Sequence, residues 1–128
     1  TYLVMTNPNI ERRVRRQGNG AETLYFYTEK HLMPDGEKWD TERPISKKQY
    51  EKYLLERDTA LSPVHKTKYR FIFADRRCEI DVYPFSVEKA VLFQYGGEAP
   101  LPEEITVLEE VTAQPAYKNR ALAASQKL

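Results

Sequence analysis

A short and highly charged segment limits what this chain can fold into: residues 10–16 read Ile-Glu-Arg-Arg-Val-Arg-Arg. The hairpin-type turn signal Gln-Gly-Asn-Gly follows at residues 17–20, so we predict that the segment is a β-strand. Because strand side chains alternate between two faces, Glu11, Arg13 and Arg15 share one of them. Cations two residues apart on one face repel each other, and this repulsion is tolerated more easily where an anion bound to the face neutralises them. The pattern therefore indicates either an anion-binding face or a solvated edge strand whose charges prevent edge-to-edge pairing.

Charge alternates with apolar residues on two further predicted strands. In residues 64–73 the cations occupy alternate positions, namely Lys66, Lys68 and Arg70. In residues 78–83 two acidic side chains, Glu79 and Asp81, alternate with apolar ones. An Asp-Arg turn at residues 75–76 joins the two strands into a predicted hairpin, which brings both signs of charge onto one face. Cys78 falls on the apolar face, where we expect a small buried side chain.

The composition excludes several kinds of protein and site. Lys and Arg number 20 and Asp and Glu number 19 in 128 residues, so no net field attracts nucleic acid. The single cysteine excludes an internal disulfide and a cysteine-based zinc site, and His31 and His65 lack metal-ligand spacing. No apolar run approaches the ~20 residues of a membrane span, so we expect a cytoplasmic protein.

The remaining elements follow from local patterns. Apolar or aromatic runs predict strands at residues 1–5, 22–30, 89–95 and 105–112, and a further strand at residues 38–45 carries Asp40 and Glu42 on one face. Ser46 and Gln49 fit a capping box that opens a helix. The apolar stripe of this helix, which we expect to pack in the core, consists of Tyr50, Tyr53 and Leu54. Residues 116–127 predict a second helix.

The predicted elements amount to about eight mostly antiparallel strands and two helices, an α+β composition. An open sheet would leave the alternating charges in water, where they need no partners. A closed barrel would turn the apolar residues outward under the helices and the charges inward into a wet tunnel. Opposed cations and carboxylates in such a tunnel suit a polyanion held beside a divalent metal ion.

A set of short motifs, in order along nearly the whole chain, resembles one protein family. The motifs are Arg13-Val14-Arg15, Thr28-Glu29-Lys30, Lys66-Thr67-Lys68-Tyr69-Arg70, Glu79-Ile80-Asp81-Val82 and Glu110-Val111-Thr112, with Tyr117 and Asn119. They resemble the CYTH superfamily of triphosphate tunnel metalloenzymes, which includes class IV adenylate cyclase, thiamine triphosphatase, inorganic triphosphatase and fungal RNA triphosphatase. The Asn-Pro-Asn turn at residues 7–9 and the helix start at Ile45-Ser46 look closest to the fusion proteins of the TRPL translocation defect type. In these proteins the tunnel domain follows a P-loop NTPase domain.

The resemblance implies a fold and a site. The fold is a closed eight-stranded antiparallel β-barrel with a few surface helices, a single tunnel domain over residues 1–128 that lacks the start of its first strand. The implied phosphate ligands are Arg13, Arg15, Lys30, Lys66, Lys68 and Arg70. The implied carboxylates near a bound Mg²⁺ or Mn²⁺ ion are Glu79, Asp81 and Glu110, and further along the acidic wall Asp40 and Glu42. Catalytic residues stay unassigned, because such a site supplies mainly charge neutralisation and positioning.

The chain departs from the family pattern at two sets of metal ligands. The family carries an acidic-x-acidic-x-Lys run on its first strand, but the corresponding strand here begins at Thr1. The family's Glu-x-Glu pair on the seventh strand corresponds here to Phe93 and Tyr95. Both losses concern metal ligands, whereas the basic residues are nearly all kept. The pattern therefore favours anion binding over catalysis.

Three hypotheses about function follow. In the first, the chain binds a triphosphate-bearing anion, such as a nucleotide or tripolyphosphate, or a phosphoinositide headgroup, and regulates an attached NTPase domain. In the second, it is an active metal-dependent triphosphatase, a phosphohydrolase whose missing carboxylates precede Thr1. In the third, it is a structural interaction domain with a degenerate tunnel. Neither nucleic acid nor a membrane span is expected in any of them.

Overall fold

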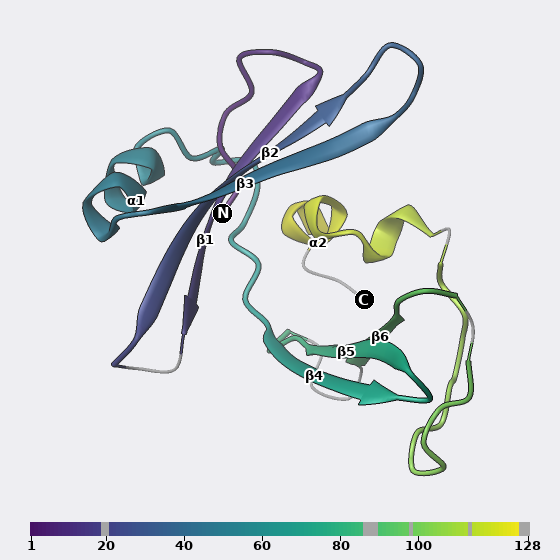
Figure 1. Ribbon diagram of the computed structural model, residues 1–128. Helices are drawn as coiled ribbons and strands as arrows, with labels where there is room; N and C mark the ends of the chain where they lie inside the picture. Colours follow the sequence, from purple (N-terminus) through teal and green to yellow (C-terminus); the bar gives the residue numbers. More distant parts are fainter. Residues whose placement is uncertain (19–20, 86–89, 98, 113, 126–128) are drawn as a thin grey trace. The chain divides into compact units, whose positions relative to one another are not determined.

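The chain divides into two compact units, residues Thr1–Pro63 and Val64–Leu128 (Figure 1). A computed structural model describes residues 1–18, 21–85, 90–97, 99–112 and 114–125. Each unit has its own three-stranded antiparallel sheet and its own cluster of buried apolar side chains. Asn19 and Gly20, which belong to the first predicted turn, lie outside the described residues.

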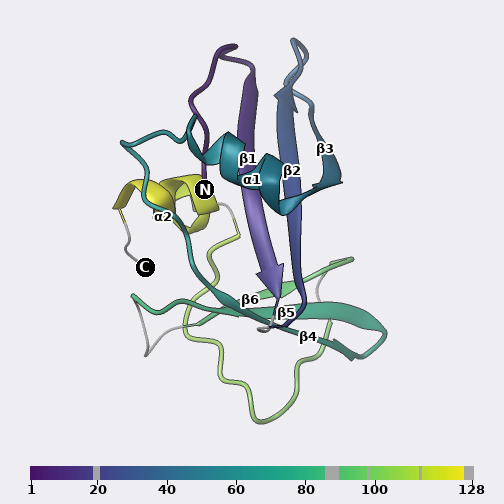
Figure 2. The same ribbon diagram turned by 90° about the vertical axis from the view of Figure 1, so that its left-hand side faces the viewer.

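The sheet of the first unit has the strand order β1-β2-β3. Its strands are β1 (Ile10–Gly18), β2 (Thr23–Leu32) and β3 (Lys38–Ile45). Aromatic and β-branched residues favour the extended conformation of β2, because their side chains pack well on a pleated surface. Helix α1 (Lys47–Leu54) follows β3 directly, and Figure 2 shows it lying across the face of β1 and β2. The predicted charged segment at residues 10–16 is therefore a strand, as expected.

The core of the first unit lies between α1 and this sheet face. Leu3, Val14 and Tyr27 are buried together. The partly buried residues packed against them are Ile45, Tyr50, Tyr53 and Leu54. Tyr27 and Tyr53 stack with their ring centroids 4.8 Å apart. The prediction that the apolar stripe of α1 serves core packing is therefore confirmed.

A capping box begins α1, as predicted. The Ser46 hydroxyl accepts a hydrogen bond from the Gln49 amide at 3.1 Å. The Gln49 side chain in turn accepts one from the Ser46 amide at 2.9 Å. Two backbone amides at the start of the helix, which would otherwise lack intrahelical partners, are thereby satisfied.

Ser46→Ala should lower the free energy of unfolding by about 1 kcal/mol, because the Gln49 amide loses its acceptor. Urea denaturation of the variant and the parent chain would measure the difference. Ser62→Ala, in an exposed loop of the same unit, serves as the matched control. If the two variants have the same unfolding midpoint, the cap does not contribute to stability.

The second unit has the sheet order β4-β5-β6. Its elements are the strands β4 (Thr67–Phe73), β5 (Arg76–Val82) and β6 (Ala90–Gln94), the 3₁₀ turn η1 (Pro115–Tyr117) and the helix α2 (Asn119–Ser125). Tyr83, Val91 and Leu122 form its buried apolar cluster, which joins the end of β5, β6 and α2. The predicted hairpin of β4 and β5 is confirmed. Cys78 is buried, as expected from its place on the apolar alternation.

The predicted closed eight-stranded barrel is wrong. Each unit has an open three-stranded sheet, and no sheet closes on itself among the described residues. A barrel needs an unbroken ladder of backbone hydrogen bonds around its circumference. Two segments expected to supply strands do not do so. Residues 1–5 contribute only isolated bridges at Tyr2 and Leu3, and residues 105–112 form no strand.

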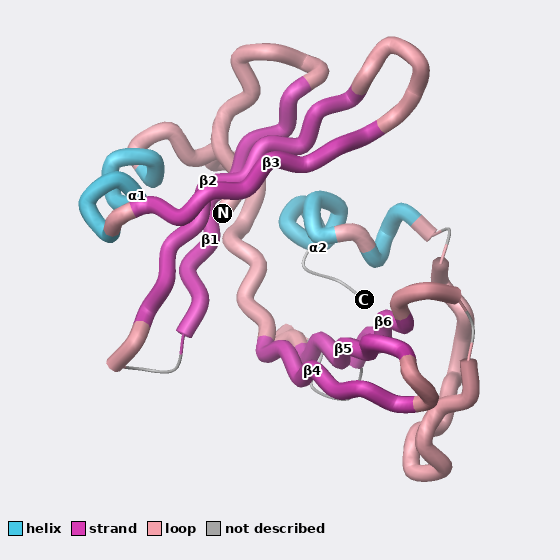
Figure 3. Tube along the Cα trace, in the orientation of Figure 1, coloured by secondary structure: helices cyan, strands magenta, loops and turns pink. Residues whose placement is uncertain are grey.

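The segment between β6 and η1 is loop in its described part (Figure 3). Its alternating β-prone residues predicted a strand, but propensity alone does not form one without a partner strand. Val107 and Leu108 are exposed there. The second predicted helix begins later than expected, because η1 precedes it and α2 begins at Asn119. Its predicted last residues, 126 and 127, lie outside the described residues, as does Lys89 at the start of the predicted strand 89–95. No helix in the described part of the chain is long and apolar enough to cross a membrane.

Candidate anion-binding site

The register of β4 and β5 places opposite charges directly across from each other. Lys68 pairs with Asp81, and Arg70 pairs with Glu79. Because these residues share one face of the sheet, the side chains can contact each other. Lys68 Nζ lies 3.6 Å from Glu79 Oε1, and Arg70 Nε lies 3.6 Å from the same oxygen. One carboxylate therefore holds two cations of the face in place.

Lys66 lies just before β4 and makes the shortest ion pair of this face. Its Nζ donates to Asp81 Oδ2 at 2.6 Å and to Asn119 Oδ1 at 3.5 Å. Asp81 has a relative exposure of 0%, and Glu79 is also buried. These contacts connect the start of β4, the end of β5 and the first residue of α2. Lys66 thus serves the interior of the unit, whereas Arg70, whose side chain is 63% exposed, faces outward.

The two carboxyl groups differ in their electrostatic surroundings. Burial raises the pKa of Asp81 above its ordinary value, although the hydrogen bond from Lys66 opposes this shift. Burial would also raise the pKa of Glu79. However, the adjacent Asp81 carboxyl and the three neighbouring cations outweigh burial and lower that pKa. Glu79 is therefore the carboxylate that keeps its negative charge most firmly on this face.

Two buried oxygen atoms near this cluster have no hydrogen-bond partner among the described residues. They are Asp81 Oδ1 and the Tyr83 hydroxyl. Tyr83 is fully buried, and its burial, together with the charges of Asp81 and Glu79, raises the pKa of its phenol. Leaving a polar atom buried and unpaired costs free energy, so these two oxygen atoms destabilise the unit unless a further group reaches them.

The β4–β5 face opens into a hollow of about 460 Å³. Its charged lining consists of Arg70, Arg77 and Glu79, and its other lining residues are Phe71, Ile72, Cys78 and Tyr95. The Arg77 guanidinium carbon lies 5.2 Å from the centroid of the Tyr95 ring. Arg77 was not among the residues predicted from the sequence. Its position two residues before Glu79 was the available signal, because it puts Arg77 on the same face.

The predicted ligands of the first unit also share a sheet face. Lys30 pairs with Glu11 and Asp40, and Thr28 separates Arg13 from Glu42. Arg15 Nη2 contacts Glu42 Oε1 at 2.6 Å, and its guanidinium lies 4.8 Å from the Phe26 ring centroid. Four cations, Lys38 included, share this face with three carboxylates, an excess of one positive charge. The excess is larger on the β4–β5 face, where Lys66, Lys68, Arg70 and Arg77 oppose two carboxylates.

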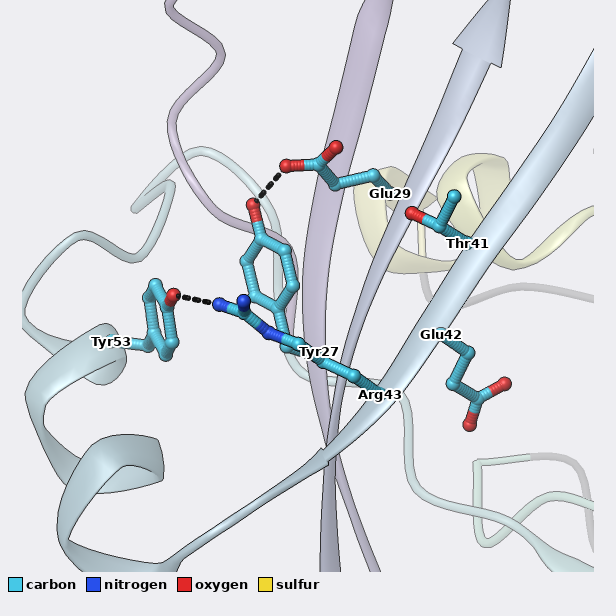
Figure 4. A pocket seen from close by; sticks show the side chains of 6 residues that line it. All are labelled: Tyr27, Glu29, Thr41, Glu42, Arg43 and Tyr53. Atoms are coloured by element: carbon cyan, nitrogen blue, oxygen red, sulfur yellow. Dashed lines mark hydrogen bonds between the residues drawn. The ribbon is translucent and has the colours of Figure 1, made fainter.

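A second hollow, of about 330 Å³, lies beside β3 in the first unit (Figure 4). Its lining residues are Tyr27, Glu29, Thr41, Glu42, Arg43 and Tyr53. The Tyr27 hydroxyl donates to Glu29 at 2.7 Å, and Arg43 donates to the Tyr53 hydroxyl at 2.9 Å. Burial and the contact with Glu29 raise the pKa of Tyr27 to about 12. These polar groups satisfy each other, which indicates a structural role.

The predicted metal ligands lie in both units. Asp40 and Glu42 lie on β3, whereas Glu79 and Asp81 lie on β5. Glu110 lies in the loop before η1, where its carboxylate accepts a hydrogen bond from Thr112 at 3.2 Å. Among the described residues, no group of three or more His, Cys, Asp or Glu side chains could hold a metal ion.

Comparisons of the chain with protein-family models, with curated proteins and with solved structures find no match. The resemblance to the CYTH superfamily therefore stays a prediction. What the chain can bind has to be inferred from its own residues.

Proposed function

We propose that the β4–β5 face of the Val64–Leu128 unit binds the phosphate groups of a polyphosphate anion, such as a nucleoside triphosphate or tripolyphosphate. The observation that carries this proposal is the excess of cations on the face, where four basic side chains oppose two carboxylates. A local excess is needed because the chain as a whole has a net charge of only +1.

Arg70 and Arg77 are the proposed phosphate ligands, because both line the hollow on this face. A guanidinium can donate two parallel hydrogen bonds to a phosphate, which gives affinity as well as orientation. The ion pair with Glu79 holds the Arg70 side chain in place. Lys66 has a different part in this proposal from the one that the family resemblance implies. Its ammonium group is occupied by Asp81, so it supports the face instead of contacting phosphate.

The β4–β5 carboxylates do not fit a resident Mg²⁺ or Mn²⁺ ion. Such ions need several oxygen ligands, and in the described part of this unit the face has two carboxylates, Glu79 and Asp81. The Lys66 ammonium contacts Asp81 at 2.6 Å and so occupies the place that a metal ion would take. We therefore propose binding without metal-assisted hydrolysis, and the triphosphatase hypothesis has less support. Regulation of an attached NTPase domain, a phosphoinositide ligand and a cytoplasmic location stay predictions.

Isothermal titration calorimetry with tripolyphosphate at low salt tests the proposal. Arg70→Ala and Arg77→Ala should each weaken binding by about ten-fold or more, because each removes a charged hydrogen bond worth roughly 1.5–3 kcal/mol. The affinity of the parent chain should also fall as salt rises, since exposed charges are screened. Lys48→Ala, which removes an exposed cation from α1, is the matched control and should leave binding unchanged.

Circular dichroism would establish that each variant keeps its fold. No measurable binding of tripolyphosphate or GTP by the parent chain at low salt would refute the proposal. Equal losses in Lys48→Ala and Arg70→Ala would also count against it, because they would mean that the anion responds to total charge and not to this face.

A further inference from the structure

We infer that the anion bound at the β4–β5 face carries a planar aromatic ring next to its phosphates, and that this ring stacks on Tyr95. The inference rests on the proposed function and adds the chemical class of the ligand. It predicts a preference for base-bearing phosphates over a phosphate chain alone.

The lining of the hollow divides into two chemical kinds. Arg70, Arg77 and Glu79 provide charge, whereas the remaining side chains are aromatic or apolar. Ile72 and the ring of Tyr95 offer little to a bare phosphate chain, because phosphate oxygens prefer hydrogen-bond donors and water to hydrocarbon. Their presence beside two arginines is what a ligand with a charged end and a flat apolar end requires.

Tyr95 is the residue suited to hold the flat end of the ligand. It is 45% exposed, and it directly follows the last residue of β6, where its amide donates to the Arg77 carbonyl at 2.9 Å. The Arg77 guanidinium packs over the Tyr95 ring at 5.2 Å, so a phosphate held by Arg77 lies within a short reach of that ring. Base–aromatic stacking tolerates any base, because every base has a π-face.

The charge state of Tyr95 also suits an anionic ligand. Burial, followed by the negative charges of Glu79 and Asp81, raises the pKa of its phenol. The side chain is therefore neutral at physiological pH and does not repel a phosphate. The ring can then contribute stacking while the arginines neutralise the phosphates.

The test compares two ligands that have the same phosphate chain and the same sugar, ATP and ribose 5-triphosphate. We expect ATP to bind the parent chain about ten-fold or more tightly than ribose 5-triphosphate, as one stacked base can supply. Tyr95→Leu should abolish this difference by weakening ATP alone, and Tyr95→Phe, which keeps the ring, should retain it. Tyr69→Leu is the matched control, because Tyr69 is an exposed tyrosine of the same sheet that does not line the hollow.

The outcomes separate this inference from the function on which it rests. Equal affinity of the parent chain for ATP and ribose 5-triphosphate would overturn the stacking. If Arg70→Ala then binds neither ligand, the proposed phosphate site is still supported. An ATP preference that survives in Tyr95→Leu would also overturn it, because the base would then lie elsewhere. Absence of binding by either ligand would overturn both proposals. Unfolding midpoints of the Tyr95 and Tyr69 variants would show that the differences do not come from loss of fold.

Discussion

Asp81→Ala should lower the stability of the Val64–Leu128 unit by about 3–5 kcal/mol, the cost of breaking a buried ion pair by removing one partner. Asp81 is fully buried, and Lys66 donates to it at 2.6 Å. Without the carboxylate, the Lys66 ammonium would be left without its charge partner in a place where only 16% of its side chain reaches solvent. This penalty exceeds the typical effect of a single surface substitution several-fold.

The measurement is urea denaturation, followed by circular dichroism and by tryptophan fluorescence. The chain has one tryptophan, Trp39, which lies in the other unit. Circular dichroism follows both units, so the part of its transition that comes from the second unit should shift to lower urea, whereas fluorescence reports on the first unit. Asp40→Ala, an exposed aspartate on β3, is the matched control and should change stability by no more than about 0.5 kcal/mol.

A double variant shows whether the unpaired lysine is the cause. Lys66→Met/Asp81→Ala removes both charges, so it should recover part of the stability lost in Asp81→Ala. The single variant Lys66→Met gives the reference. If the loss of stability in the double variant equals the sum of the losses in Lys66→Met and Asp81→Ala, the two residues act independently. The ion pair would then not explain the effect. An Asp81→Ala variant as stable as the parent chain would contradict the prediction outright.

Leu3→Ala should destabilise the Thr1–Pro63 unit by about 2–5 kcal/mol, the usual cost of truncating a fully buried leucine. Leu3 has a relative exposure of 0% and packs with Val14 and Tyr27. Its segment is held by backbone hydrogen bonds on both sides: the Leu3 amide donates to the Arg12 carbonyl at 3.0 Å, and the Val4 amide donates to the Glu56 carbonyl at 2.9 Å. Because these bonds fix the backbone, the cavity left by the side chain cannot easily collapse.

Trp39 fluorescence during urea denaturation would follow this unit. Leu55→Ala is the matched control, since Leu55 is 86% exposed at the end of α1, and its truncation should cost no more than about 0.5 kcal/mol. Equal effects of Leu3→Ala and Leu55→Ala would mean that residues near Thr1 do not belong to the core. That result would contradict the burial of Leu3.

Patterns spanning a few residues predicted several features of this chain correctly. The alternation of charge predicted β1, β4 and β5, and the Ser46–Gln49 spacing predicted the start of α1. These predictions succeed because the two-residue period of a strand and the geometry of a capping box involve only near neighbours along the chain. The same alternation, together with a short turn, predicted that two cations would face two carboxylates, namely Lys68 and Arg70 opposite Asp81 and Glu79.

The two largest failures concern contacts between segments distant in sequence. Residues 105–112 have the composition of a strand, yet they form none, because a strand also needs a partner with free hydrogen-bonding groups. The barrel was wrong for the same reason, since closure depends on every strand finding its neighbour.

The sequence by itself therefore determined which residues form the charged strands and which cations and carboxylates share a face. Only the tertiary structure decided that Lys66 forms an ion pair with the buried Asp81, whereas Arg70 faces outward. It also decided that Arg77 and Tyr95 line the hollow beside Arg70. Burial and neighbouring charge set these roles, and both depend on how β6 pairs with β5 and on how Leu122 of α2 packs with Tyr83 and Val91. No local pattern encodes that packing, because it joins residues far apart along the chain.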